Sequence, residues 1–119
     1  MKFDNNVPIY LQLIEELKKD IISGKLKPGE RILSVRELAF NLKVNPNTMQ
    51  RALISLEEMG LIYTERTNGK FVTTNINLVE KLKNELAKEK AMNYLKDMNH
   101  IGINNQEAIK YLQELGGNK

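Results

Sequence analysis

The sequence lacks cysteine altogether and holds only one histidine in 119 residues. Without cysteine, neither a disulfide framework nor a thiolate metal site can form. No apolar run approaches the length of a membrane-spanning helix, and the start MKFDNN has no apolar segment of the kind that signal peptides carry. These absences predict a cytoplasmic protein with no membrane segment.

Excess charge of either sign is also scarce, because 18 Lys plus Arg stand against 15 Asp plus Glu, for a net charge of +3. Attraction to an anionic partner must therefore come from local clustering of basic residues. Such a cluster occurs in residues 34–56, which hold three basic residues and one acidic residue. The charge distribution is compatible with a nucleic-acid partner.

Groups suited to catalysis are few. The chain has no Gly-rich phosphate loop, and its acidic residues are scattered over predicted outer faces. His100 follows Asp97 by one helical turn and could imitate a metal pair, but a single imidazole at a helix end more often interacts with the terminal carbonyl groups. We expect no enzyme activity, no metal site and no cofactor.

The first 60 residues predict three helices. The first helix begins at Pro8 and ends at Gly24, with apolar residues at the spacing of one face. Ser34 and Glu37 form an S-x-x-E capping box that starts the second helix. The third helix is predicted to have Asn45 as its cap and Pro46 in its first turn, and to end before Gly60.

The segment LIYTERTNGKFVTT follows, with two β-prone runs around Asn68 and Gly69. An Asn-Gly pair tolerates positive φ and suits the tight turn of a hairpin. Three helices and a hairpin in this order predict a winged helix-turn-helix domain over residues 1–75, in which the third helix enters the major groove of DNA. The predicted fold class is mainly α, or α+β by its small sheet.

Residues 76–119 are predicted to form a helical dimerisation tail. A long helix, with Asn77 and Glu80 as its capping box, precedes a short helix that begins near Asn104 or Asn105. Two such helices bury little alone, so a second copy is the expected partner, with the long helix contacting the winged domain on one face and the partner on the other. The residues assigned to dimerisation are Leu82, Leu86, Tyr94, Leu95, Met98, Ile109 and Leu112. A tail of this size has little room for an effector pocket, and the existence of an effector stays open.

The third helix is chemically two-sided. On a helical wheel, its inward side carries Met49, Ala52, Leu53 and Leu56, and its outward side carries Asn47, Arg51, Ile54 and Glu58, flanked by Thr48 and Gln50. Asn and Gln can pair with adenine, Arg can bind guanine bidentately, and Thr can donate to a phosphate. An ordinary solvated face is the alternative interpretation, but the helix pair, the hairpin and the local positive charge favour DNA recognition.

Several segments resemble the GntR family of bacterial transcription regulators, specifically its short YtrA-like branch. These segments are VPIYLQL, IISGKLKPGERI, SVRELA, VNPNTMQRALISLEEMGLI and ERTNGKFVT. The resemblance implies a homodimeric repressor that binds an inverted-repeat operator in double-stranded DNA. It implies DNA contacts at Ser34, Arg36, Asn47, Thr48, Gln50, Arg51, Gly69 and Lys70. The chain departs from the family pattern at Leu33, where proline is usual, and at Thr67, where glycine is usual.

Two other binding functions are alternatives to DNA recognition. Winged helices also serve as protein-interaction modules, and such a module would lack the steep loss of affinity with salt that DNA binding shows. RNA binding is the weaker alternative, because Tyr63 and Phe71 alternate with polar residues as hairpin core candidates rather than as a stacking platform.

Overall fold

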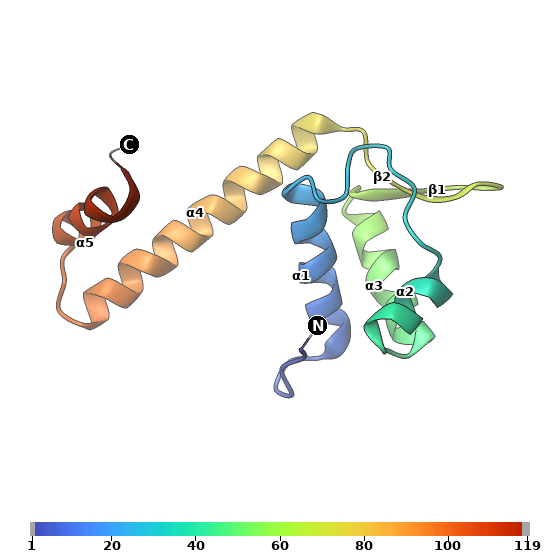
Figure 1. The fold of residues 1–119 in the computed structure, drawn as a ribbon, viewed down its shortest axis with the longest axis horizontal. Coiled ribbons are helices and arrows are strands. Elements are labelled where there is room, and N and C mark those ends of the chain that lie inside the picture. The colour runs from blue at the N-terminus through green and yellow to red at the C-terminus, as the bar shows by residue number, and fades with distance from the viewer. Residues whose placement is uncertain (1, 118–119) are drawn as a thin grey trace. The chain divides into compact units, whose positions relative to one another are not determined.

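The computed structural model describes residues 2–117. The elements in chain order are α1 (Ile9–Ile22), α2 (Val35–Leu42), α3 (Pro46–Glu58), β1 (Ile62–Glu65), β2 (Gly69–Val72), α4 (Ile76–His100), α5 (Asn105–Leu112) and a π-helical turn at Gln113–Gly117. Three helices, a hairpin and C-terminal helices confirm the predicted fold class (Figure 1). None of the helices in residues 2–117 is both long and apolar enough to cross a membrane.

The chain divides into two compact units, one ending at Leu82 and the other beginning at Lys83. We call them the winged unit and the C-terminal unit. The first turns of α4 belong to the winged unit because Leu78, Val79 and Leu82 pack, partly buried, against its core. The predicted functional division after residue 75 stays a prediction.

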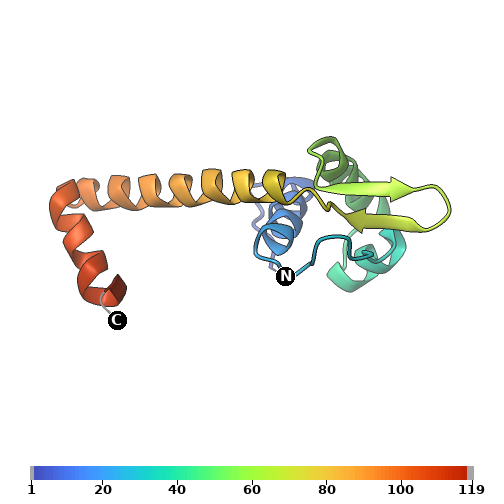
Figure 2. The same cartoon turned by 90° about the horizontal axis from the view of Figure 1, so that it is seen from above.

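The core of the winged unit lies between α1, α2, α3 and the hairpin. Helices α1 and α3 lie side by side (Figures 1 and 2), and α2 packs on α3. The buried residues that fill this core are Leu13, Ile14, Leu17, Ile21, Ala39, Met49, Ala52, Leu53, Leu56, Leu61, Ile62 and Val72. Their burial removes the apolar stripes of all three helices from water, which is the main force that holds the unit together.

The caps of α2 and α3 form as predicted. The Glu37 amide donates to Ser34 Oγ over 3.1 Å, and the Ser34 amide donates to Glu37 Oε1 over 3.1 Å. Asn45 Oδ1 accepts from the Asn47 amide over 2.7 Å at the start of α3. Between these helices Lys43 adopts a left-handed conformation, with φ 57° and ψ 48°. The short turn thereby fixes the position of α3 relative to α2.

The predicted hairpin is confirmed, but its turn differs from the prediction. Strands β1 and β2 are antiparallel, and Glu65 pairs with Gly69, so the loop consists of residues 66–68. Gly69 has φ +102°, whereas Asn68 is not among the positive-φ residues of the described chain. A loop of this length needs one positive φ at its end rather than the two that an Asn-Gly turn provides. On the other edge of β2, the Ile32 amide donates to the Lys70 carbonyl over 2.9 Å.

The start of α4 corrects a second prediction. Asn75, not Asn77, caps this helix, because Asn75 Oδ1 accepts from the Leu78 amide over 3.1 Å. The Thr73 amide is bonded to the Leu61 carbonyl, and the Asn75 amide donates to Thr73 Oγ1 over 3.0 Å. Asn75 therefore lies directly before the first helical residue, Ile76, and Asn77 falls inside the first helical turn.

The C-terminal unit pairs the end of α4 with α5. The Tyr94 hydroxyl donates to the Ala108 carbonyl over 2.7 Å, and Ala108 is fully buried. Asn104 caps α5 by accepting from the Glu107 amide over 2.9 Å, as the prediction of a helix beginning near Asn104 or Asn105 requires. Several large apolar side chains of this unit are exposed, namely Met92, Ile101, Ile109, Tyr111, Leu112 and Leu115.

Candidate nucleic-acid interface

Helix α3 divides into a buried and an exposed side as the sequence predicts. Met49, Ala52, Leu53 and Leu56 are 0% exposed. Asn47, Gln50 and Arg51 are exposed in the first two turns, and Thr48 is half-buried. Because the buried side anchors the helix over most of its length, the exposed amide and guanidinium groups have a fixed backbone beneath them. A rigid backbone is what a side chain needs to read the edge of a base.

The guanidinium of Arg51 is not simply free in solvent. Its central carbon lies 3.6 Å from the centroid of the Tyr10 ring, so the side chain stacks on the first turn of α1. Such a contact is a cation–π interaction. Stacking uses the flat face of the guanidinium and leaves its N–H groups, which lie in the plane, available to acceptors.

The start of α2 combines a cap with an electrostatic effect. Ser34 and Arg36 are both exposed. The hydrogen bond from the Ser34 backbone amide, reinforced by the Ser34 hydroxyl and by the charge of Arg31, holds the pKa of the Glu37 carboxyl below its usual value. Glu37 therefore stays charged at neutral pH and compensates the positive end of α2. Ser34 Oγ accepts from the Glu37 amide, and its hydroxyl hydrogen is directed to the Glu37 carboxylate.

Lys70 belongs to a polar triad that joins the hairpin to α3. Its ammonium donates to Thr64 Oγ1 over 2.9 Å and lies 3.3 Å from Glu57 Oε1. The Thr64 hydroxyl in turn donates to Glu57 Oε1 over 3.1 Å. An ammonium has three N–H donors, so Lys70 keeps one donor beyond the triad. The sequence did not indicate this triad, whose members lie on three different elements.

Gly69 lies beneath the side chain of Arg31. A Cβ atom placed on Gly69 would come within 3.2 Å of Arg31 Nε, so glycine permits the close approach as well as the positive φ. A shallow groove runs between the start of α2 and the hairpin, and its lining includes Arg31, Ser34, Arg66, Gly69 and Lys70. Three of the eight predicted contact residues thus line one groove, together with two further arginines.

Sequence reasoning missed Arg31 and Phe40 as members of this surface. Arg31 lies just outside the basic stretch counted from residue 34 onward, and its place over Gly69 depends on pairing with Phe71, far along the chain. Phe40 is 83% exposed on α2 and lines a depression with Arg36 and Pro46. Phe40 follows Arg36 by four residues and so lies on the same face of α2, a spacing that the sequence already shows. Arg36 is thereby placed beside the first turn of α3.

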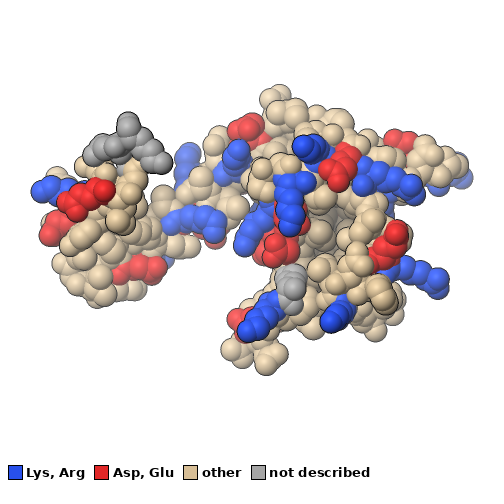
Figure 3. Space-filling model, in the orientation of Figure 1, with Lys and Arg blue, Asp and Glu red and all other residues tan. Residues whose placement is uncertain are grey.

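On the face shown in Figure 3, Lys and Arg side chains are interspersed with Asp and Glu over the winged unit. They do not merge into one continuous basic patch on that face. This agrees with the small net charge of +3. Any attraction to a polyanion by this unit therefore rests on particular side chains, such as those of the groove, rather than on bulk charge.

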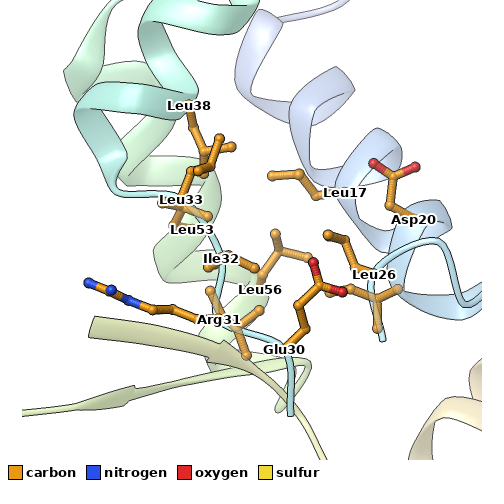
Figure 4. Close-up of a pocket in the computed structure, with 12 residues that line it drawn as sticks. Leu17, Asp20, Leu26, Glu30, Arg31, Ile32, Leu33, Leu38, Leu53 and Leu56 are labelled. Carbon is orange, nitrogen blue, oxygen red and sulfur yellow. The ribbon is translucent and has the colours of Figure 1, made fainter. Parts of the chain in front are cut away.

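A cavity of about 300 Å³ opens beside the core of the winged unit (Figure 4). Leucine and isoleucine side chains line most of it, Asp20 and Glu30 contribute carboxylates at its edge, and Arg31 extends away from it (Figure 4). Among residues 2–117, no buried side-chain polar atom lacks a hydrogen-bond partner, and no group of three or more His, Asp or Glu could hold a metal ion. The cavity is thus mainly apolar, with its carboxylates at the edge.

Comparison with known proteins gives consistent relatives. The family model described as "Bacterial regulatory proteins, gntR family" matches residues 9–72. The "HTH-type transcriptional repressor YtrA" of Bacillus subtilis is 34% identical over 113 residues, covering 93% of this chain and 86% of that protein. The solved structure of a "GntR family transcriptional regulator from Listeria monocytogenes" is 40% identical, covers 95% of this chain and 99% of its own, and has a TM-score of 0.86. The structure of AraR(DBD) in complex with operator ORR3 is 30% identical over 61% of this chain and 88% of its own, with a TM-score of 0.55.

Proposed function

Because the chain belongs to the gntR family of bacterial regulatory proteins, we propose that it represses transcription as a homodimer bound to an inverted-repeat operator in double-stranded DNA. It is a helix-turn-helix transcription regulator, and the names of its relatives describe a function that is not enzymatic. A cytoplasmic location is part of the proposal, since a bacterial regulator meets its operator there. The proposal includes no cofactor and assigns no effector.

The observation that carries the proposal is the exposed side of α3. Asn47, Gln50 and Arg51 project from its first two turns above a fully buried opposite side. In helix-turn-helix proteins these turns enter the major groove. We assign Asn47 and Gln50 to adenine edges and Arg51 to a guanine, because the carboxamide and guanidinium groups match those bases bidentately.

The groove beside the hairpin is assigned to the DNA backbone. Lys70 retains a donor for a phosphate oxygen, and Ser34 and Gly69 lie in the same groove, where Gly69 presents no side chain to the DNA backbone. Arg31 and Arg66 line the same groove and add two guanidinium groups. Thr48 is assigned to a phosphate next to the recognition helix, and Arg36 to the backbone or base edge beside the start of α3. The operator complexes of AraR(DBD), a relative of the winged unit, support a DNA ligand for this surface.

Pairing of two chains is assigned to the C-terminal unit. Leu112 is 50% exposed and Ile109 48% exposed on α5, and among the described residues of this unit the buried core consists of little beyond Ala108. Apolar surface of this kind is stabilised when a second copy covers it. Tyr94, Leu95 and Met98 are half-buried, as is Leu86, and Leu82 packs against the winged-unit core; their share in pairing stays a prediction.

A symmetric dimer would place two α3 helices in successive major grooves, about 34 Å apart along the duplex. An operator with the same two-fold symmetry then follows from the symmetry of the protein. Occlusion of a promoter by the bound dimer is the simplest route to repression.

Selection of bound duplexes from a random DNA pool tests the proposal. Purified wild-type protein should enrich a palindromic sequence, and titration of that duplex should saturate at two chains. A variant with Gln50→Ala and Arg51→Ala should fail to enrich the same sequence while remaining folded, because both side chains are exposed and the stabilising contact that it removes is the Arg51–Tyr10 stack.

Two results would count against the proposal. Enrichment of a non-palindromic sequence at one chain per duplex would contradict the proposed dimer and inverted repeat, but would still support sequence-specific DNA binding. No enriched sequence at low salt would leave the fold as a protein-interaction module, the alternative function of winged helices.

A further inference from the structure

The contact between Tyr10 and Arg51 links two elements that have different tasks. Arg51 lies on the exposed side of α3, while Tyr10 lies in the first turn of α1 and packs, partly buried, against the core. The guanidinium carbon is 3.6 Å from the ring centroid. Helix α1 is thus more than a core element, because one of its side chains supports a group on the recognition surface.

The first turn of α1 is itself well anchored. The Gln12 carboxamide accepts from the Asp4 amide over 2.8 Å and donates to the carbonyls of Asp4 and Val7 over 2.7 and 2.8 Å. Three hydrogen bonds from one side chain fold the preceding segment back onto α1. Pro8, which occupies the N-cap position, has a φ fixed by its ring. The Tyr10 ring therefore projects from a defined backbone.

An anchored ring restricts the guanidinium that stacks on it. An exposed arginine samples many rotamers, and binding a base requires that it give up most of them. Stacking on Tyr10 selects one arrangement before DNA arrives. The N–H groups in the guanidinium plane stay free, so the same arrangement can donate two parallel hydrogen bonds to a guanine.

We propose that Tyr10 is a positioning residue that presets Arg51 for base recognition and so determines the specificity at one base pair of each half-site. The inference rests on the proposed function, and it adds a residue of α1 to the determinants of the operator sequence. Tyr10 itself contacts no base. The property that matters is the flat aromatic face, not the hydroxyl group.

The variants Tyr10→Phe and Tyr10→Leu separate these properties. Affinities are measured for the selected operator and for every single base-pair change in one half-site. Tyr10→Phe should match the wild type throughout. Tyr10→Leu should lose discrimination at one base pair by roughly 2- to 10-fold, the entropy cost of ordering one long side chain, and should leave the other positions unchanged.

Arg51→Ala identifies which base pair is concerned, and should lose about 5- to 150-fold of discrimination there. Adding Tyr10→Leu to Arg51→Ala should cause no further loss at that position, because the two residues act as one unit. An equal loss on all sequences, or unchanged discrimination by Tyr10→Leu, would overturn the proposal.

Nuclear magnetic relaxation of the Arg51 Nε–Hε group in the free protein gives a readout that does not depend on DNA. The group should be ordered in the wild type and in Tyr10→Phe, and mobile in Tyr10→Leu. A mobile group in the wild type overturns the inference even if Tyr10→Leu fails to fold. If the wild type selects no DNA sequence, the proposed function fails. If the wild type selects a sequence but Tyr10→Leu keeps full discrimination at every base pair, only the inference about Tyr10 fails.

Discussion

The Nζ atom of Lys70 on β2 lies 3.3 Å from Oε1 of Glu57 in the last turn of α3. The hairpin is thereby joined to the recognition helix by an ion pair that Thr64 reinforces from β1. The Lys70 side chain is 19% exposed and that of Glu57 is 39% exposed, so solvent screens the pair only in part. The pair fixes the orientation of the wing relative to α3.

A double-mutant cycle measures this link. Lys70→Met, Glu57→Gln and the double variant should give a coupling in the free energy of unfolding of about 0.5–1 kcal/mol, measured by urea denaturation. The coupling is small because solvent partly screens the Lys70–Glu57 ion pair. In each single variant, the Thr64 hydroxyl can still bond to the partner that remains. Purely additive effects of the two substitutions would show that the contact does not hold the wing.

Salt dependence tests whether Lys70 also contacts DNA. Its remaining N–H donor is assigned to a phosphate, so Lys70→Met should weaken binding on every sequence and lower the salt slope by about one unit. Lys96→Met, at an exposed position of α4 in the C-terminal unit, is the matched control and should leave the slope unchanged. If Lys70→Met keeps the wild-type salt slope, Lys70 does not contact a DNA phosphate and serves only in the triad with Thr64 and Glu57.

The capping box at α2 makes stability depend on pH. The Ser34 amide and hydroxyl lower the pKa of Glu37 relative to the usual 4.5. A lowered pKa in the folded state means that the charged carboxylate stabilises the fold above the unfolded pKa. That contribution is lost as the pH falls through the folded pKa. Glu37→Gln keeps a carbonyl oxygen for the Ser34 amide but cannot ionise.

Melting temperatures from pH 7 down to acid values should therefore fall more steeply for the wild type than for Glu37→Gln. Glu58→Gln, the same change at an exposed position of α3, should keep the wild-type slope. Parallel curves for the wild type and Glu37→Gln would show that the charge of the Glu37 carboxylate does not stabilise the capping box.

The left-handed residue between α2 and α3 offers a stabilising substitution. Lys43 has φ 57°, a conformation that costs a non-glycine residue about 1–2 kcal/mol. Glycine avoids this strain, but it loses more conformational entropy on folding, which offsets part of the gain. Lys43→Gly should raise the free energy of unfolding by roughly 0.5–1 kcal/mol. Lys19→Gly, within α1, should lower it by a similar amount. Destabilisation by Lys43→Gly would show that its side chain contributes to the turn.

Leu112 tests the pairing of two chains. Leu112→Glu places a charge on apolar surface that pairing would bury, so the dimer should dissociate at micromolar concentration, as measured by sedimentation equilibrium. Gln106→Glu, exposed on the same helix, is the charge-matched control. Substitution is a sharper test than truncation after Thr74, which would also remove Leu78, Val79 and Leu82 from the winged-unit core. A persistent dimer in Leu112→Glu would place the interface elsewhere.

Most helix boundaries could be predicted because their causes are local. The Ser34–Glu37 box, the Asn45 cap with Pro46, and the stop at Gly60 each involve residues within one turn, and all three form. The buried side of α3 followed from its period of 3.6 residues. These features depend on neighbours along the chain and therefore can be derived from a single sequence.

The features that escaped prediction depend on residues that are distant in sequence. The Tyr10–Arg51 stack, the Lys70–Glu57 pair and the position of Arg31 over Gly69 all join different elements. The two local errors, at Asn68 and Asn77, have a related cause, since pairing between strands decides where each turn or helix begins. The residue types allowed more than one position for the hairpin turn and for the helix cap, and strand pairing determined which position is used.

The most direct test of the central claim is the affinity of the wild-type protein for its selected duplex as a function of salt. Neutralisation of phosphates by Arg31, Arg66, Lys70 and their copies in a second chain predicts a steep linear fall of log affinity with log salt. The loss should be about 10³-fold or more between about 50 and 200 mM salt. An affinity that stays nearly constant over this range would contradict DNA backbone binding and favour an apolar protein interface on the winged unit.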